Sequence, residues 1–416
     1  MGGEYDVAIV GSSLAGCTAA ILLARKGLRV ALLEANRNPA AYKRMCTHYI
    51  QSSALPTLQR LGLDAELEAA GAVPNHGSVW CRFGWVREPE PTDRPPHGYN
   101  LRREVLDPLI RKTAAQVPGV DLMLGAKLRE LTRGPDGRVD GVIADRAGRL
   151  SCRLVIGADG RSSKVARLAG LPGRESRNDR FAYFASFRNV TIPHGQPVQL
   201  WLLEPDAAYA FGNDAGVTVL TVMPGKSRLS EFDGDREAAL LRVFEDLPDA
   251  PDLTNAERVS EVVGTRDYPS ITRRRIASPG VALVGDAAMV LDPLWGAGCG
   301  WALQTAEWLS DAVATPLATG SDRQIDLAAR RYQRRHRVRL WPHQYFAIDF
   351  SQHPRFNPMQ RLLFAGAARD PWVADRFYAY GTRNRSPLVM FSPRMLARAA
   401  RARRVGGMKT LIATQR

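Results

Sequence analysis

The first part of the chain alternates between short apolar runs and a stretch with helical spacing. Residues 5–10, YDVAIV, form a β-branched apolar run that ends at Gly11 and predict a strand. An Ala- and Leu-rich stretch at 14–26 predicts a helix, and LRVALLE at 28–34 predicts a second strand ending in Glu34. Because strand, helix and strand in this order are typical of a βαβ unit, we expect an α/β fold.

The hydrophobic pattern changes twice further along the chain. Residues 101–117 predict a helix, and residues 120–160 predict several strands, the last of which is CRLVIGADG. Between about 176 and 272, strand-like runs such as FAYFASF and GVTVLTVM are separated by Pro, Gly and Asp. This pattern predicts an antiparallel sheet inserted into the α/β unit. After about residue 300 the spacing is helical to the end.

These changes divide the chain into three predicted units. We expect a discontinuous cofactor-binding domain at 1–75, 100–175 and 273–320, a substrate domain at 76–99 and 176–272, and a basic helical region at 321–416.

Composition is that of a globular protein that can bury a core, with 45% hydrophobic and 24% charged residues among 416. No apolar run approaches the roughly 18 residues of a membrane span, and the start lacks the layout of a signal peptide. We therefore expect a cytoplasmic protein. The five cysteines are odd in number and scattered, which favours reduced thiols, and the seven histidines show no spacing typical of a metal site.

The net charge of +15 is concentrated near the end of the chain. Residues 321–416 hold 20 Arg or Lys against 5 Asp or Glu, whereas the rest of the chain is balanced. Arg394, Arg398 and Arg401 share one face of a predicted helix. A solvated helical surface explains this excess, and the alternatives are an acidic carrier protein, an anionic membrane or, least favoured, nucleic acid.

The turn after the first predicted strand has the spacing of a dinucleotide-binding motif. Gly11, Ser13 and Gly16 match G-x-G-x-x-G with Ser at the middle position. The first Gly permits the tight turn, the last permits close packing of helix and strand, and the helix N–H groups attract a pyrophosphate. Glu34 ends the second strand, where a carboxylate accepts the ribose hydroxyls of FAD or NAD but not a 2′-phosphate.

A second glycine-rich segment favours FAD over NAD. In ALVGDAAMVLDPLWGAGCGWALQ an apolar run ends at Gly285 and Asp286, and a Pro and three glycines precede a helical stretch. A nicotinamide dehydrogenase has no need of a second strand end so late in the chain. FAD is longer, and an Asp at a strand end can bind its ribityl chain.

These motifs resemble those of the class A flavoprotein monooxygenases, whose prototype is para-hydroxybenzoate hydroxylase, and of the related geranylgeranyl reductases and flavin halogenases. The resemblance lies in GSSLAG with Glu34, in GADGRSSKVAR, and in GDAAMVLDPLWGAGCG. It implies a Rossmann-like FAD-binding domain of the glutathione-reductase type. The implied FAD-binding residues are Gly11, Ser13, Leu14, Ala15, Gly16, Glu34, Ala35, Arg44, Arg103, Asp159, Gly160, Gly285, Asp286, Pro293, Gly296, Gly298 and Cys299.

Two departures from the family pattern limit what can be carried over. Met289 stands where the family usually has His after Gly-Asp-Ala-Ala, so a role of that imidazole is in doubt. The Trp-x-Trp-type motif of tryptophan halogenases is missing, which counts against halogenation.

The resemblance implies that NADH or NADPH reduces FAD, that O2 adds at the flavin C4a, and that one oxygen atom passes to a small aromatic or polycyclic metabolite. No catalytic side chain follows from it. Candidate pocket residues are His48, Gln51, Trp201, Tyr209 and Trp295, although an aromatic residue in a strand is more often part of the core. A reductase of a polyprenyl or other lipid-like substrate and a halogenase-like enzyme acting on a carrier-bound substrate are the alternatives.

Overall fold

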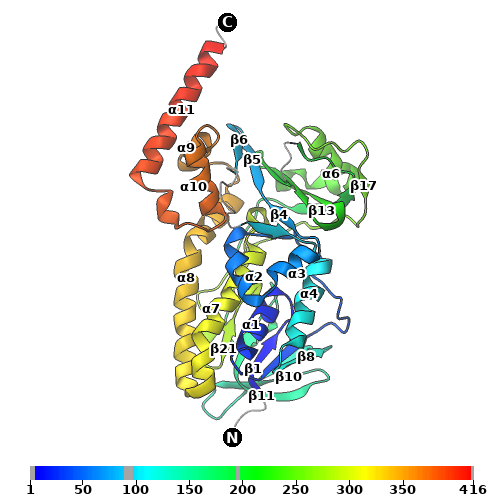
Figure 1. Ribbon diagram of the computed structural model, residues 1–416, viewed down its shortest axis with the longest axis vertical. Coiled ribbons are helices and arrows are strands. Elements are labelled where there is room, and N and C mark those ends of the chain that lie inside the picture. Colours follow the sequence, from blue (N-terminus) through cyan, green and yellow to red (C-terminus); the bar gives the residue numbers. More distant parts are fainter. Residues whose placement is uncertain (1–4, 89–96, 194–196, 414–416) are drawn as a thin grey trace.

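The computed structural model describes residues 5–88, 97–193 and 197–413. The molecule is elongated, with one sheet near the N-terminus, a second sheet at the opposite end, and a column of helices along one side (Figure 1). The predicted boundaries at residues 1 and 416, and part of the predicted segment 76–99, lie outside the described residues.

The first sheet has eight strands and carries the predicted βαβ unit at its centre. Its main path is β20 (Ala277–Ser278), β21 (Val281–Leu283), β11 (Gly148–Gly157), β1 (Tyr5–Val10), β2 (Val30–Glu34) and β8 (Val120–Leu124). The strands from β21 to β8 are parallel, with Ile9 opposite both Ile156 and Leu32. Strands β9 (Leu128–Arg133) and β10 (Val139–Ala144) extend β11 in antiparallel fashion. The carboxyl ends of the parallel strands therefore meet at one edge.

Helix α1 (Leu14–Ala24) lies against this sheet and is buried along its whole length. Small and apolar residues on every side allow it to pack between the sheet and two other helices, α4 (Arg103–Gln116) and α7 (Gly298–Thr319). Its N-terminus therefore points toward the edge where the strands end.

The second sheet also has eight strands, in the order β17-β13-β16-β15-β14-β5-β6, with β18 beside β13. Neighbouring strands are antiparallel except β14 and β5. One face packs on α6 (Arg236–Glu245), and the other faces the C-terminal helices. The strand bounds are β5 (Gly77–Cys81), β6 (Gly84–Arg87), β13 (Ala182–Arg188), β14 (Val198–Leu202), β15 (Ala207–Gly212), β16 (Thr218–Met223), β17 (Glu257–Arg258) and β18 (Val263–Thr265).

Short elements connect the two sheets. They are β3 (Tyr49–Ile50), β4 (Val73–Asn75) and β7 (Gly98–Asn100), which form a three-stranded sheet, the pair β12 (Arg174–Ser176) and β19 (Ser270–Thr272), and the helices α2 (Leu55–Leu61), α3 (Asp64–Ala69) and α5 (Lys164–Leu168).

The C-terminal region is helical, as expected, and begins with α8 (Asp322–Gln352), which runs beside α7 along one side of the molecule (Figure 1). Helices α9 (Pro358–Ala367), α10 (Pro371–Gly381) and α11 (Pro393–Ala413) follow. Two arginines of the predicted basic stripe contact α10, because Arg394 and Arg398 lie over the ring of Trp372 and Arg398 pairs with Asp370 at 2.6 Å.

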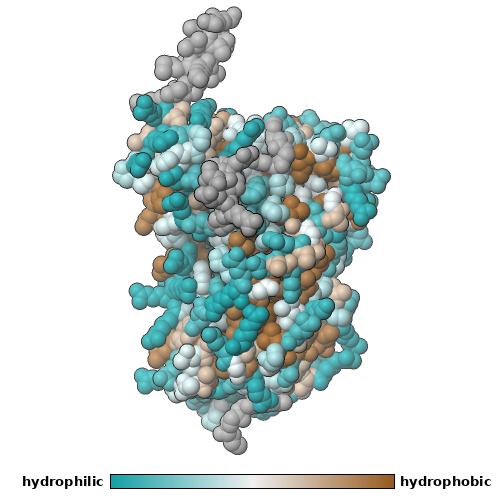
Figure 2. All heavy atoms as spheres, in the orientation of Figure 1, coloured by the Kyte–Doolittle hydropathy of each residue, from teal (hydrophilic) through white to brown (hydrophobic). Residues whose placement is uncertain are grey.

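The face drawn in Figure 2 is mainly hydrophilic, with hydrophobic residues showing between the polar ones. Among the residues described, none of the helices combines the length and apolar character needed to cross a bilayer.

Candidate functional site

A cavity of about 530 Å³ lies at the carboxyl ends of the parallel strands. Its walls come from segments that are far apart in the sequence: the turn after β1, the end of β2, the turns after β11 and β21, and the start of α7. A crevice at this edge of a doubly wound sheet is the usual position of a nucleotide site, and its volume falls within the range of small-molecule sites.

The turn between β1 and α1 has no space for side chains at its two glycines. Gly11 has a φ of +105°, and a Cβ there would lie 2.5 Å from the carbonyl oxygen of Ala158. A Cβ on Gly16 would lie 1.8 Å from the carbonyl oxygen of Gly11. Ser13 precedes α1 without capping it through its side chain. The first N–H groups of α1 are therefore left for an anion at the cavity.

Glu34 lines the cavity at the end of β2, as the motif predicts. Its Oε1 accepts a hydrogen bond from the Asn36 backbone N–H at 2.8 Å, and its Oε2 accepts one from the Ser12 hydroxyl at 2.6 Å. These bonds hold the carboxylate beside the strand end, where both oxygens keep lone pairs for further donors.

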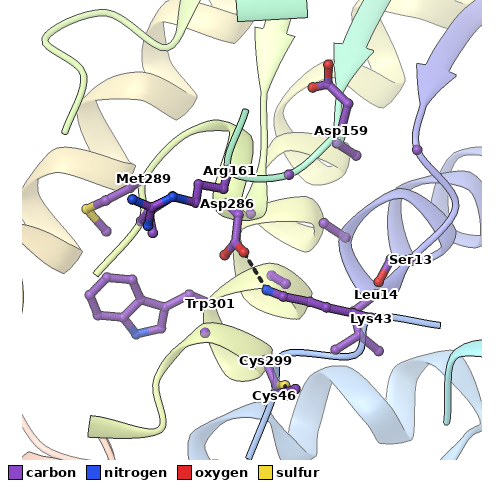
Figure 3. A pocket seen from close by; sticks show the side chains of 18 of the residues that line it. Ser13, Leu14, Lys43, Cys46, Asp159, Arg161, Asp286, Met289, Cys299 and Trp301 are labelled. Carbon is purple, nitrogen blue, oxygen red and sulfur yellow. Dashed lines mark hydrogen bonds and ion pairs between the residues drawn. The ribbon is translucent and has the colours of Figure 1, made fainter. Parts of the chain in front are cut away.

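An ion pair crosses the cavity in Figure 3, between the Lys43 ammonium and the Asp286 carboxylate at 2.7 Å. The negative charge of Asp286 raises the pKa of Lys43. Lys43 was missed in the sequence, where Arg44 was selected instead. Arg44 does not line the cavity; it is exposed and pairs with Glu261 at 2.5 Å. Lys43 and Arg44 are neighbours in an irregular segment, and only Lys43 lines the cavity.

Arg103 also lines the first cavity, where it is buried and paired with Asp107. Its Nη2 donates to Asp107 at 2.6 Å and to the Ser13 hydroxyl at 2.7 Å. Its Nη1 lies 3.7 Å from the sulfur of Cys46 and 3.8 Å from that of Cys299, and these two free thiols are 3.7 Å apart. Figure 3 shows both sulfurs side by side at the floor of the cavity.

The middle motif contributes mainly backbone to the cavity. Asp159 and Gly160 line it, but the Asp159 carboxylate accepts from the Ser163 hydroxyl at 2.5 Å and from the Val165 N–H at 3.0 Å. This carboxylate therefore holds the start of α5. Arg161, which follows Gly160, stacks over the ring of Tyr268 at 4.2 Å, and its Nη1 is buried and has no hydrogen-bond partner in the part of the chain that the structure describes.

A buried ion pair stabilises the turn before α7. Arg180 and Asp292 are both fully buried and 2.5 Å apart. The other oxygen of Asp292 accepts from the Leu294 N–H at 3.0 Å, which caps the 3-10 turn Pro293–Trp295. Gly296 has a φ of +59° and lies against the ring of Tyr49, so the backbone there faces the cavity directly.

Of the predicted FAD-binding residues, all but Gly16 and Arg44 line the cavity. Met289, which replaces the family's histidine, also lines it, and an imidazole enters from a different element, because His336 of α8 reaches the same wall. Burial lowers the pKa of His336 to about 4. Sequence spacing gave no signal for His336, since it lies in a run of arginines.

A second cavity of about 140 Å³ adjoins the first, because Leu291, Ala297 and Trp301 line both. Gln51 and Trp295, two of the predicted pocket residues, lie on its wall. Helices α8, α9 and α10 supply most of the rest, including His343, Phe346, Phe364, Phe377 and Tyr380, and Arg383 follows the end of α10. In the sequence this region has the pattern of a basic helical surface, which gives no signal for these residues.

Three predicted pocket residues lie outside both cavities. Trp201 is fully buried on the face of the second sheet that packs on α6, and its Nε1 donates to the carbonyl of Pro248 at 2.8 Å. Tyr209 faces the C-terminal helices but stacks on Phe211. His48 accepts the backbone N–H of Arg103 at 3.0 Å. All three side chains are buried, and strand alternation directs Trp201 and Tyr209 away from both cavities.

Comparison with known proteins gives matches over most of the chain. A family model described as "FAD binding domain" matches residues 4–339. A menaquinone reductase of Mycolicibacterium smegmatis is 34% identical over 172 residues, 41% of each chain. The 6-methylpretetramide 4-monooxygenase of Streptomyces rimosus is 27% identical over 79% of this chain and 78% of its own.

Solved structures show the same fold. The p-nitrophenol 4-monooxygenase PnpA of Pseudomonas putida superimposes with a TM-score of 0.73 at 19% identity, over 92% of this chain and 99% of its own. Digeranylgeranylglycerophospholipid reductases and flavin-dependent halogenases are also among the matches.

Proposed function

The chain belongs to the FAD binding domain family and is an FAD-dependent oxidoreductase, and from that premise we propose that it is an NAD(P)H-dependent monooxygenase of a small aromatic or polycyclic metabolite. The observation that carries this proposal is the second cavity, which is lined mainly by aromatic and aliphatic side chains and opens on the turn before α7. A substrate bound there would lie next to the redox end of the cofactor.

The residues of the first cavity fit FAD along its length. Glu34 would accept the ribose hydroxyls, the N-terminus of α1 would hold the pyrophosphate, and Asp286 would accept a ribityl hydroxyl. Backbone N–H groups between Gly296 and Cys299 would meet the pyrimidine edge of the ring. The glycine contacts support this assignment, because a Cβ on Gly11 or Gly16 would clash with backbone oxygens and disrupt the tight turn that brings the N-terminus of α1 to the cavity.

Bound FAD supplies electron transfer from a reduced nicotinamide and the activation of O2. The tasks left to the chain are to orient the substrate and to exclude water. Met289, Ala297, Trp301 and Leu340 form a buried apolar cluster where the two cavities meet. This cluster would shield the reacting edge of the flavin from solvent.

The proposal is tested with the purified, FAD-loaded protein. NADH or NADPH oxidation is measured over a panel of aromatic metabolites, and the product is analysed after reaction under ¹⁸O2. We expect substrate-stimulated oxidation and one labelled oxygen atom per product. Asp286→Ala is expected to lose FAD and activity, whereas Asp311→Ala, which removes an exposed carboxylate of α7 paired with Arg60, should keep both.

A flavin-dependent reductase of a polyprenyl or other lipid-like substrate is the second candidate. The similarity to menaquinone reductase favours it, although that match covers 41% of the chain. Substrate reduction without ¹⁸O incorporation would replace the first proposal by this one. Halide incorporation into a carrier-bound substrate would instead identify a halogenase, and salt-sensitive binding of an acidic carrier or anionic vesicles would assign a docking role to the basic C-terminal helices.

A further inference from the structure

Arg383 places a positive charge in the wall of the second cavity. It follows the C-terminal end of α10, and its guanidinium lies 5.2 Å from the centre of the Trp301 ring. A Cβ on Gly300 would lie 3.0 Å from its Nη2, so the first turn of α7 also packs closely against it. The charge therefore lies next to the wall that the two cavities share.

The neighbours of Arg383 are neutral. Its Nε donates to the Gln51 side-chain oxygen at 2.9 Å, and its Nη2 donates to the Ser53 hydroxyl at 3.2 Å. The Gln51 amide nitrogen is bound in turn by the carbonyls of Trp295 and Gly381, which fixes the orientation of the amide. Among the residues the structure describes, no carboxylate lies within ion-pair distance of Arg383.

Two other arginines of the site, unlike Arg383, are paired with carboxylates. Arg103 is buried against Asp107 at 2.6 Å, and Arg180 is buried against Asp292 at 2.5 Å. Arg383 is only half-buried, but it lacks the counter-charge with which charges removed from water are normally paired. Burial lowers the pKa of Arg383 to about 9, so the side chain remains a cation at neutral pH.

Three other polar side chains belong to residues that line the second cavity. The indole N–H groups of Trp295 and Trp301 are buried and have no partner among the described residues. His343 stacks on Tyr380, and burial lowers its pKa to about 4, so it is neutral. Among the residues the structure describes, the cavity wall therefore holds one cation, and no acidic side chain lines it.

The backbone of Arg383 is also in an unfavourable conformation. Its φ is +64°, in the left-handed region where a helix end normally has Gly or Asn. Strain of this kind is found at functional sites, where a particular side chain is needed.

We propose that Arg383 binds an oxyanion, a carboxylate or an ionised phenol or enol, on a planar aromatic substrate held in the second cavity. This proposal rests on the proposed function and assigns the charge of its substrate. The aromatic walls accept a flat ring, and Arg383 supplies the positive charge for its anionic oxygen. A cavity of about 140 Å³ takes one ring, since an engineered cavity of about 150 Å³ binds benzene.

Binding of benzoate and of benzamide, which has a similar shape but no charge, tests the proposal. Both are titrated into the FAD-loaded protein by calorimetry, with the flavin absorbance recorded in parallel. We expect benzoate to bind at least 10-fold more tightly than benzamide, because hydrogen bonds to charged groups are worth about twice neutral ones. Arg383→Gln should abolish this preference and change the benzamide affinity less than about threefold.

The matched control is Arg376→Gln, since Arg376 belongs to α10 but stacks on Trp372 outside the cavity. It should keep the full preference for benzoate. Equal binding of the two probes by the unaltered protein, no binding of benzoate, or a preference that survives in Arg383→Gln would each overturn the proposal.

Neither titration requires turnover. A preserved benzoate preference without ¹⁸O incorporation would therefore refute the monooxygenase proposal and leave the oxyanion site standing.

Discussion

The ion pair between Arg180 and Asp292 is the buried contact on which the turn before α7 depends. Both side chains are fully buried, and Asp292 also accepts the Leu294 N–H through its second oxygen. Arg180 Nη1 donates to the carbonyl of Phe350, so the pair links the turn to α8 as well. Asp292→Asn keeps an oxygen for the Leu294 N–H and removes only the negative charge. The guanidinium is then left buried without a counter-charge.

The size of the effect follows from that burial. Breaking a buried pair by removing one partner costs about 3–5 kcal/mol, whereas exposed pairs are worth about 0–1 kcal/mol. With an unfolding entropy of about 2.1 cal/mol/K per residue, this loss lowers Tm by roughly 3–6 °C in a chain of 416 residues. Because the turn forms one wall of the first cavity, FAD affinity should fall together with stability.

Thermal unfolding and FAD titration of four proteins measure the coupling: the unaltered chain, Asp292→Asn, Arg180→Met and the double variant. We expect the double variant to be at least about 2 kcal/mol more stable than the sum of the single losses predicts, because it contains no unpaired buried charge. Arg266→Met, which breaks an exposed pair with Asp233, is the control and should change Tm by less than about 1 °C. Additive losses, or an Asp292→Asn protein as stable as the unaltered chain, would refute this reasoning.

Three further predictions concern the first cavity. Gly16→Ala should prevent FAD binding or folding, since the added Cβ would lie 1.8 Å from the Gly11 carbonyl oxygen. The control Gly234→Ala should keep its FAD, because no atom lies within 4 Å of the added Cβ. The absorbance of bound flavin measures both outcomes. Glu34→Ala should weaken FAD binding about 10-fold or more, because a charge-assisted hydrogen bond contributes about 1.5–3 kcal/mol. The Tm of the apoprotein should fall much less. An unchanged Kd for FAD would contradict the assignment of Glu34 to the ribose. Burial lowers the pKa of His336 from 6.5 to about 4 in the folded state, so the unfolded chain takes up a proton there before the folded chain does. The free energy of unfolding is therefore unaffected by this histidine above about pH 6.5 and decreases as the pH falls toward 4. Between pH 7.5 and pH 5 this amounts to about 2 kcal/mol, and His336→Phe should remove that part of the acid sensitivity in Tm measurements.

Local spacing in the sequence was sufficient to predict the nucleotide end of the site. The run before Gly11, the spacing to Glu34, and the apolar run ending at Asp286 each lie within a local strand–turn–helix unit. Such units have backbone requirements, a left-handed φ or a close approach, that only particular residues meet. The structure therefore places these residues around one cavity, as the motifs predict.

The substrate end could not be predicted in this way, and the tertiary structure alone decided it. Lys43 rather than Arg44 enters the cavity, Trp201 turns to the face that packs on α6, and Arg383 reaches Gln51 across more than three hundred residues of sequence. A basic residue in a helical region has the same local pattern whether it faces solvent or a cavity. Its role is set by which distant elements pack beside it, and that depends on the packing of the C-terminal helices against the second sheet.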